Sequence, residues 1–451
     1  MLERESFLIN LPVPIVAIIC SDWLRIQDVS RLDTSFCQRE TRATVLDIIS
    51  SVTHKSSCTY NDSFELFMQW VVRRQLSIDC LTIPRRAFPW KGGTMALFLK
   101  SIGHLLQAMN VSYLHHTSAF FYSDISYYCK NLRELYLRDS STSSGSVRSV
   151  LMNCPHLVVL DLDNKERFHS PCLDGLRLPN LQVLRLQSCD EFICETLTTA
   201  TPNLQKLRMN GTHYLNPAGT QQLCEGCPHL HEVRLPRSYS YQDLYLEADC
   251  VYPLVTHCTN LEALDLSGQR GIYDTCFTDA TVSFSKLRKL CIQFMYGLTD
   301  ITLIHITKNC PLLQVLGRDG CSFSDVGLAA VAGSFAHLHT LYIGSRNKST
   351  MSGYLTGLKD LPALVELGLY EVDAGDAILE HIGMELPQLR RLELQSCYGY
   401  TLDGLVSVAK QLQRIVLTAQ SGVDPCFVEL SARYPRLEVY PTTEDGFNCI
   451  F

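Results

Sequence analysis

The feature that most constrains this chain is a short leucine pattern that returns along most of its length. The pattern is Leu-x-x-Leu-x-Leu, and the steps between successive first leucines are 25, 24, 23, 26, 31, 26, 26, 25, 26, 25 and 23 residues. The first leucines are Leu132, Leu157, Leu181, Leu204, Leu230, Leu261, Leu287, Leu313, Leu338, Leu364, Leu389 and Leu412. A period of about 20–50 residues is typical of a repeat fold, so the length of 451 residues does not by itself set the number of domains.

Each copy of the pattern predicts one strand with a buried side. Alternate residues of a strand point to opposite faces, so Leu135 and Leu137 point the same way. One copy cannot bury that face alone, whereas stacked copies bury it against each other. Each buried aliphatic side chain contributes roughly 1.5–3 kcal/mol, so the leucines supply the main stabilisation. We therefore expect a parallel sheet of repeat strands.

The segments between the leucine copies have the spacing of helices. Ser324-Asp325 and Thr299-Asp300 each precede apolar residues at helical intervals, and such residues accept the unpaired amide hydrogens of a helix N-terminus. Cys154-Pro155, Cys227-Pro228 and Cys310-Pro311 each stand just before a strand, where Pro ends a helix and Cys packs beneath the turn. The sequence therefore predicts an α/β solenoid, a curved parallel sheet with outer helices.

The chain resembles the cysteine-containing leucine-rich repeats. Their signature is Cys-x-x-Leu-x-x-Leu-x-Leu-x-x-Cys, and Cys310, Leu313, Leu316 and Cys321 match it, with Arg318 in the third leucine position. Weaker copies extend the repeats outward in both directions. We assign residues 51–451 to this array, with clear repeats over 132–440.

Residues 8–48 do not follow the repeat. Ile15, Ile19 and Trp23 are four residues apart, which predicts a short apolar helix, and a second helix is expected from Asp28. Two short helices cannot bury this many apolar residues among themselves. They either pack on the first repeats as a cap, or they present an apolar face to a partner.

The N-terminal segment resembles an F-box. The matching residues are Leu11, Pro12, Ile15, Ile19, Leu24, Asp28, Leu32 and Cys37. Two positions depart from the family pattern: Pro14 stands where an acidic residue is common, and no Trp follows Cys37. The resemblance implies a small all-α segment over residues 1–50 that binds a Skp-type adaptor of a cullin ubiquitin ligase. The adaptor-binding residues it implies are Leu11, Pro12, Ile15, Ile19, Leu24 and Leu32.

No sequence motif for catalysis, a cofactor or a metal stands out. The chain has no G-x-x-x-x-G-K-[ST] loop, no G-x-G-x-x-G after a strand and no G-x-S-x-G elbow. Cys224, Cys227, His229 and His231 resemble a zinc ligand set. However, Cys227-Pro228 occupies the same repeat position as Cys154-Pro155, which favours a packing role. We predict no catalytic residue, no cofactor and no metal site.

Composition limits the compartment and the partners. The net charge of −7 gives no general attraction to nucleic acid or to an anionic membrane, and no stretch approaches the ~18 apolar residues of a membrane helix. Asn10, Pro12 and Pro14 interrupt the apolar run near the N-terminus, so it does not match a signal peptide. The sequence therefore predicts a cytoplasmic or nuclear protein whose 20 cysteines are reduced and packed as small apolar residues.

The strand residues that alternate with the leucines predict a binding face. In one column, three arginines fall on consecutive repeats: Arg185, Arg208 and Arg234. With strands ~4.8 Å apart they repel each other, which an acidic or phosphorylated protein segment would relieve. We expect these arginines to anchor such a substrate, with Tyr136 adding contact area and with Lys206 and Arg138 extending the patch. The alternative is a solvated charged face balanced by nearby acids, namely Asp161, Asp265 and Glu232.

These patterns lead to two hypotheses from different classes. The first is the substrate-recognition subunit of an SCF-type cullin ubiquitin ligase, monomeric within a hetero-complex. It would hold substrate on the concave repeat face and a Skp-type adaptor through the N-terminal helices, and it would perform no chemistry itself. The alternative is a non-catalytic leucine-rich-repeat scaffold, for example axonemal or signalling, whose N-terminal helices only cap the repeats.

Overall fold

A computed structural model describes most of the chain between residues 46 and 441. The chain forms two compact units, residues 1–208 and residues 209–451, called here the first and second unit. The described ranges are 46–47, 49–50, 53–56, 64–83, 93–112, 119–140, 143–169, 172–191, 194–210, 215–235, 248–269, 271–278, 284–317, 321, 323–332, 334–344, 358–417 and 425–441.

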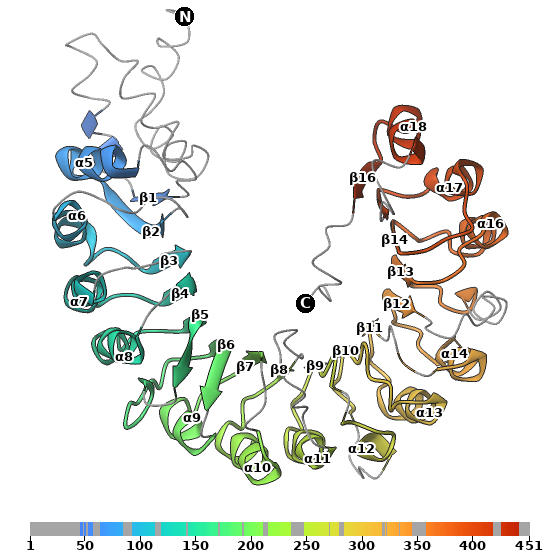
Figure 1. Cartoon of the computed structure of the whole chain (residues 1–451), viewed down its shortest axis with the longest axis horizontal. Helices are drawn as coiled ribbons and strands as arrows, with labels where there is room; N and C mark the ends of the chain where they lie inside the picture. The colour runs from blue at the N-terminus through green and yellow to red at the C-terminus, as the bar shows by residue number, and fades with distance from the viewer. Residues whose placement is uncertain are drawn as a thin grey trace, which may run out of the picture. The chain divides into compact units, whose positions relative to one another are not determined.

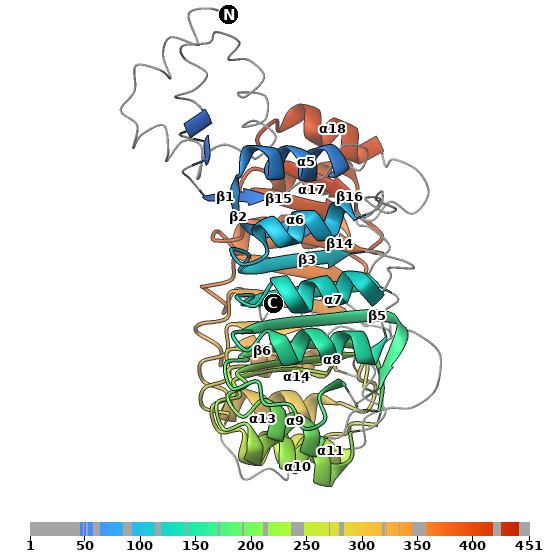
Figure 2. The same cartoon turned by 90° about the vertical axis from the view of Figure 1, so that its left-hand side faces the viewer.

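The first unit alternates strands and helices, and each strand pairs in parallel with the strand of the next repeat. Its strands are β1 (Thr53–Ser56), β2 (Ser77–Ile83), β3 (Ala108–Ser112), β4 (Glu134–Ser140), β5 (Val159–His169), β6 (Val183–Glu191) and β7 (Lys206–Asn210), the last of which runs two residues past the boundary. Its helices are α5 (Phe64–Arg74), α6 (Thr94–Ile102), α7 (Ala119–Tyr128), α8 (Ser144–Asn153) and α9 (Cys194–Ala200). The strands form one layer and the helices cover one side of it (Figure 1). Figure 2 shows α5, α6, α7 and α8 stacked side by side.

The second unit continues the same alternation, again with parallel pairing between neighbouring repeats. Its strands are β8 (Glu232–Arg234), β9 (Ala263–Asp265), β10 (Lys289–Cys291), β11 (Val315–Gly317), β12 (Thr340–Gly344), β13 (Glu366–Tyr370), β14 (Arg391–Gln395), β15 (Arg414–Leu417) and β16 (Glu438–Pro441). Its helices are α10 (Pro217–Gly226), α11 (Ala248–His257), α12 (Thr275–Thr278), α13 (Asp300–Asn309), α14 (Asp325–Ala332), α16 (Asp376–Glu385), α17 (Leu402–Ala409) and α18 (Pro425–Arg433).

The strand register confirms the predicted role of the leucines. In the first unit Leu135 pairs with Leu160, which pairs with Leu184, and all three are 0% exposed. In the second unit Leu367 and Leu392 occupy neighbouring positions in the same way, also with 0% exposure. The core of each unit is therefore a stack of aliphatic side chains between the strands and the helices, as the repeat predicts.

The predicted helix ends are also confirmed. Helix α13 begins at Asp300 after the cap residue Thr299, whose hydroxyl accepts a hydrogen bond from the amide of Ile301 at 3.4 Å. Cys154, Cys227 and Cys310 each follow the last residue of a helix and are buried. Burial raises the pKa of Cys154 to about 12 and of Cys310 to about 12, so these thiols stay protonated at neutral pH.

Several predictions fall outside the described residues or remain untested. Leu11, Pro12, Ile15, Ile19, Leu24 and Leu32 all lie outside the described ranges. The division into 1–50 and 51–451 stays a prediction, and the first described strand begins at Thr53. Thirteen of the described cysteines are not in a disulfide, and twelve of these are buried, whereas Cys291 is disulfide-bonded and departs from the expectation of reduced cysteines. None of the described helices combines the length and the apolar character needed to cross a bilayer.

Candidate functional site

The candidate site lies on the side of the strands that faces away from the helices. Residues that alternate with the buried leucines form a column there, and the register aligns Asn110, Tyr136, Asp161 and Arg185 on the successive strands β3 to β6. The side chains of this column lie outside the aliphatic core, so core packing does not explain why Asp161 and Arg185 are charged residues.

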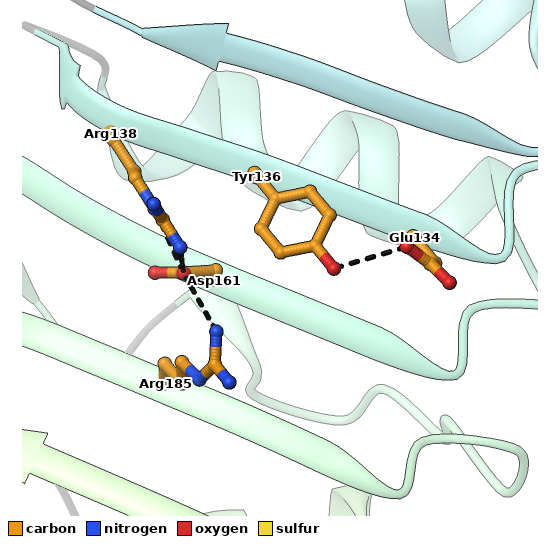
Figure 3. A network of polar contacts seen from close by, with 5 residues as sticks. All are labelled: Glu134, Tyr136, Arg138, Asp161 and Arg185. Carbon is orange, nitrogen blue, oxygen red and sulfur yellow. Dashed lines mark hydrogen bonds and ion pairs between the residues drawn. The ribbon is translucent and has the colours of Figure 1, made fainter. Parts of the chain in front are cut away.

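Two arginines converge on one carboxylate in the first unit. Arg138 donates from Nε and Nη2 to Oδ2 of Asp161, at 3.0 and 2.5 Å, and Nη1 of Arg185 lies 3.6 Å from the same oxygen (Figure 3). The Asp161 side chain is only 8% exposed, whereas the two arginine side chains are 45% and 43% exposed. The buried acid therefore holds two guanidinium groups whose remaining donors face solvent.

Tyr136 fixes one side of this cluster. Its hydroxyl donates to Oε2 of Glu134 at 3.0 Å, and the guanidinium carbon of Arg138 lies 5.5 Å from the centre of its ring. That distance is within the range of a cation–π contact. Burial, followed by the hydrogen bond to Glu134, raises the pKa of Tyr136 above its ordinary value. The phenol consequently stays neutral and donates to Glu134, which leaves Arg138 with Asp161 as its acidic partner in this network (Figure 3).

The three predicted arginines lie in two different units of the structure. Arg185 and Arg208 lie in the first unit, where the amides of Gln205 and Lys206 bond to the carbonyl of Gln182 and set β7 beside β6. Arg208 is half-buried. Arg234 lies in the second unit.

Arg234 is already paired within its own strand. It forms an ion pair with Glu232 of β8, and its side chain is 13% exposed. Asp161 and Glu232, two of the acids named for the solvated-face alternative, thus take part in ion pairs with Arg185 and Arg234. The substrate-anchoring role of these residues stays a prediction.

Sequence reasoning missed a second polar network, which lies in the second unit. The hydroxyl of Tyr342 donates to Oε1 of Glu366 at 2.7 Å, and Arg391 reaches Glu366 at 3.0 Å and Glu393 at 3.5 Å. Burial raises the pKa of Glu393, and the nearby guanidinium of Arg391 opposes that rise. The register places Glu366, Arg391 and Arg414 in one column, two residues before the column of Gly368 and Glu393 on the same strands.

The two networks differ in how far they open to solvent. Tyr342 is 1% exposed, and the side chains of Glu366, Arg391 and Glu393 are no more than 22% exposed. The contacts of this second network connect three successive strands, β12, β13 and β14. The cluster around Asp161, with its half-exposed arginines, has donors left for a ligand.

The cysteine and histidine set considered for zinc is dispersed. Cys224 and Cys227 are buried and are not in a disulfide, and His229 is exposed on the turn before β8. Within the described ranges, three or more His, Cys, Asp or Glu side chains do not come together as a metal site.

Comparison with known proteins finds two similar F-box proteins of Arabidopsis thaliana. No family model matches the chain. The chain is 24% identical over 251 residues to F-box/LRR-repeat protein 17 of Arabidopsis thaliana, a match that covers 49% of this chain and 42% of that protein. It is 26% identical over 264 residues to F-box protein MAX2 of Arabidopsis thaliana, covering 54% of this chain and 35% of that protein. The chain thus spans less than half the length of these relatives.

A solved structure supports the same assignment of the fold. A chain of the yeast Rad7–Elc1 complex aligns with a TM-score of 0.50 and 16% identity, covering 94% of this chain and 95% of that one. Parallel repeat strands, outer helices and the leucine register together define a leucine-rich-repeat fold. The chain resembles the F-box/LRR proteins.

Proposed function

We propose that the chain is a substrate-recognition subunit of an SCF-type cullin ubiquitin ligase. The observation that carries the proposal is the likeness to two F-box proteins in a chain whose repeats leave a half-exposed arginine pair on the strand face. The described residues contribute a surface of parallel repeat strands, and no metal cluster lies among them. A role in binding fits this surface better than a role in catalysis.

In this proposal the N-terminal segment and the strand face of the repeats bind different partners. The N-terminal segment, through Leu11, Pro12, Ile15, Ile19, Leu24 and Leu32, binds a Skp-type adaptor and hence a cullin. The strand face binds a protein substrate. Holding both at once raises the local concentration of the substrate beside a ubiquitin-charged enzyme, so this chain needs no catalytic residue of its own.

The substrate segment in this proposal is acidic or phosphorylated. Arg185 is 43% exposed and shares its one carboxylate partner with Arg138, so it can accept a further anion. Arg208 lies on the next strand, β7, and Tyr136 lies two strands away on β4, on the far side of Asp161. Arg234 contributes less in this scheme, because Glu232 already neutralises it.

The scaffold alternative has one observation in its favour. The ion pairs of Arg185 with Asp161 and of Arg234 with Glu232 are what a solvated, self-balanced face would contain. In that case the N-terminal helices cap the repeats and bind no adaptor. The two hypotheses therefore differ in one measurable property, which is adaptor binding.

Co-purification with a Skp-type adaptor tests the proposal. We expect the wild-type chain to retain the adaptor through size-exclusion chromatography, and the double variant Ile15→Asp/Ile19→Asp to lose it. The matched control is Met384→Asp/Val428→Asp, which places the same two charges on exposed apolar residues of α16 and α18, 71% and 61% exposed. Retention by the control shows that two added carboxylates do not themselves prevent binding. A wild-type chain that binds no adaptor supports the scaffold.

A further inference from the structure

The cluster around Asp161 differs from the three-arginine row that the sequence predicts. The two guanidinium groups that share an acidic partner are those of Arg138 and Arg185, because both lie within 3.6 Å of Oδ2 of Asp161. They come from β4 and β6 and meet over β5, the strand that carries Asp161 (Figure 3).

The two arginines of this cluster are much more exposed than the acid that they share. Two guanidinium groups share one carboxylate, and that carboxylate is 8% exposed while its partners are 45% and 43% exposed. Glu134, the other acid drawn in Figure 3, accepts the hydrogen bond of Tyr136. A ligand can therefore reach Arg138 and Arg185 more easily than it can reach Asp161. Asp163 stands beside Arg138 in the register, and Arg208 lies on the strand after Arg185.

The arginines are also held in place before a ligand arrives. Arg138 uses Nε and Nη2 on Asp161 and lies against the Tyr136 ring, which leaves its Nη1 donors uncommitted in this network. Arg185 contacts Asp161 through Nη1 at 3.6 Å, which leaves its other edge available. Guanidinium groups fixed in advance lose less side-chain entropy on binding.

We propose that Arg138 and Arg185, positioned by Asp161, form a site for a single phosphoryl group on the protein partner. A phosphomonoester offers three acceptor oxygens and about −1.5 to −2 charges, so it can accept from guanidinium groups on both sides at once. A carboxylate has one charge and two oxygens, so it offers the same two arginines less negative charge and fewer acceptors. This assignment rests on the proposed function in one respect, namely that a protein segment binds the strand face of the first unit.

Asp161 acts as a positioning residue in this site. Asp161→Asn removes a negative charge beside the two arginines, so a site governed by net charge alone would bind an anion more tightly in this variant. If Asp161 orients the arginines, the variant binds phosphopeptide more weakly and discriminates less between phosphate and carboxylate. The sign of the change thus separates positioning from simple attraction.

Fluorescence polarisation with the purified full-length chain tests the proposal. The probes are three fluorescein-labelled degenerate peptide libraries of one design, with phosphoserine, glutamate or serine at the fixed central position. We expect wild type to prefer the phosphoserine library, and Arg138→Ala or Arg185→Ala each to reduce that binding roughly tenfold or more. The matched control, Arg177→Ala, removes an exposed arginine of the segment between β5 and β6 and should leave binding unchanged.

Two outcomes overturn the site, and each is separable from failure of the ligase proposal. One is equal binding of the phosphoserine and glutamate libraries by wild type. The other is phosphoserine binding that survives both arginine substitutions. Circular dichroism confirms that each variant is folded. Adaptor retention by the same wild-type preparation shows that the ligase proposal stands even where the phosphoryl site fails.

Discussion

The carboxylate of Asp376, the first residue of α16, accepts hydrogen bonds from both the amide and the hydroxyl of Thr401, each at 2.7 Å. Thr401 is the residue that caps α17 in the next repeat. Asp274 bonds to Thr299 in the same way, at 2.9 and 2.6 Å, and Asp300 bonds to Ser324. Each of these aspartates thus links one helix N-terminus to the next and stabilises the stacking of repeats.

Removing the hydroxyl at this link should destabilise the second unit. Thr401→Val deletes the helix cap that accepts from the amide of Asp403 and also the bond to Asp376. We expect the free energy of unfolding to fall by about 1–2 kcal/mol, measured by urea denaturation. The control Thr198→Val removes an exposed hydroxyl that bonds only to a carbonyl of its own helix, and it should change stability by no more than about 0.5 kcal/mol. Equal effects of the two variants would contradict the proposed link.

A glycine makes room for the Asp376 carboxylate. A Cβ atom on Gly404 would lie 2.2 Å from Oδ1 of Asp376 and 2.9 Å from its Cα, so Gly404→Ala forces the two helices apart. We expect a loss of about 1–3 kcal/mol in the free energy of unfolding. Gly145→Ala is the matched control, because a Cβ at that position of α8 meets nothing within 4 Å. It should be neutral or stabilising by up to about 1 kcal/mol, since Ala favours helix more than Gly does.

The aspartate links predict a dependence of stability on pH. Hydrogen bonds from Thr401 lower the pKa of Asp376; burial raises the pKa of Asp274, but bonds from Thr299 and Thr302 outweigh it and lower the value overall. The pKa of each carboxyl is lower in the folded chain than its unfolded value of about 3.9. The stability it adds is therefore fully present above the unfolded pKa and is lost as the pH falls through the folded pKa.

The double variant Asp274→Asn/Asp376→Asn measures this contribution. We expect it to be less stable than wild type at pH 6 and to lose less stability than wild type between about pH 5 and pH 3. The matched control is the exposed pair Asp360→Asn/Asp403→Asn, which keeps the same change in charge. Parallel curves for wild type and the Asp274/Asp376 variant would remove the two carboxylates as a cause of acid sensitivity.

Leucines of the repeat should dominate the stability of each unit. Leu392 is 0% exposed and pairs in register with Leu367 on one side and Ile415 on the other. Leu392→Ala should lower the free energy of unfolding by about 2–5 kcal/mol, because it removes buried methyl groups and leaves a cavity. Met384→Ala, at a side chain that is 71% exposed, should cost less than about 1 kcal/mol. A comparable loss from both variants would contradict the repeat as the main source of stability.

The period of the leucines was enough to predict the fold. It fixes which residues share a column, and the register of Leu135, Leu160 and Leu184 follows it directly. The period does not predict diagonal contacts. Arg138 stands two residues beyond the Tyr136 column, yet its long side chain crosses to Asp161 on the next strand, within the diagonal reach of such side chains.

The aspartate links were missed for a related physical reason. The sequence predicts helix starts at Ser324-Asp325 and Thr299-Asp300, since capping depends on neighbours in the sequence. The contact of Asp300 with Ser324 depends on how two helices of successive repeats pack, which no local pattern specifies. The ion pair of Arg234 with Glu232 was hidden likewise, because the side-chain conformation decides whether an arginine turns to its own strand or to a ligand.

Ubiquitin-remnant profiling of cells tests the central claim most directly, because one measurement depends on both the adaptor-binding segment and the strand face. Three cell lines would carry the wild-type chain, the adaptor variant Ile15→Asp/Ile19→Asp, or the strand-face variant Arg138→Glu/Arg185→Glu. The account predicts that the same proteins lose ubiquitin in both variants, while the strand-face variant still retains the adaptor. An unchanged set of ubiquitinated proteins in both variants, or a change in one variant without the other, would contradict it.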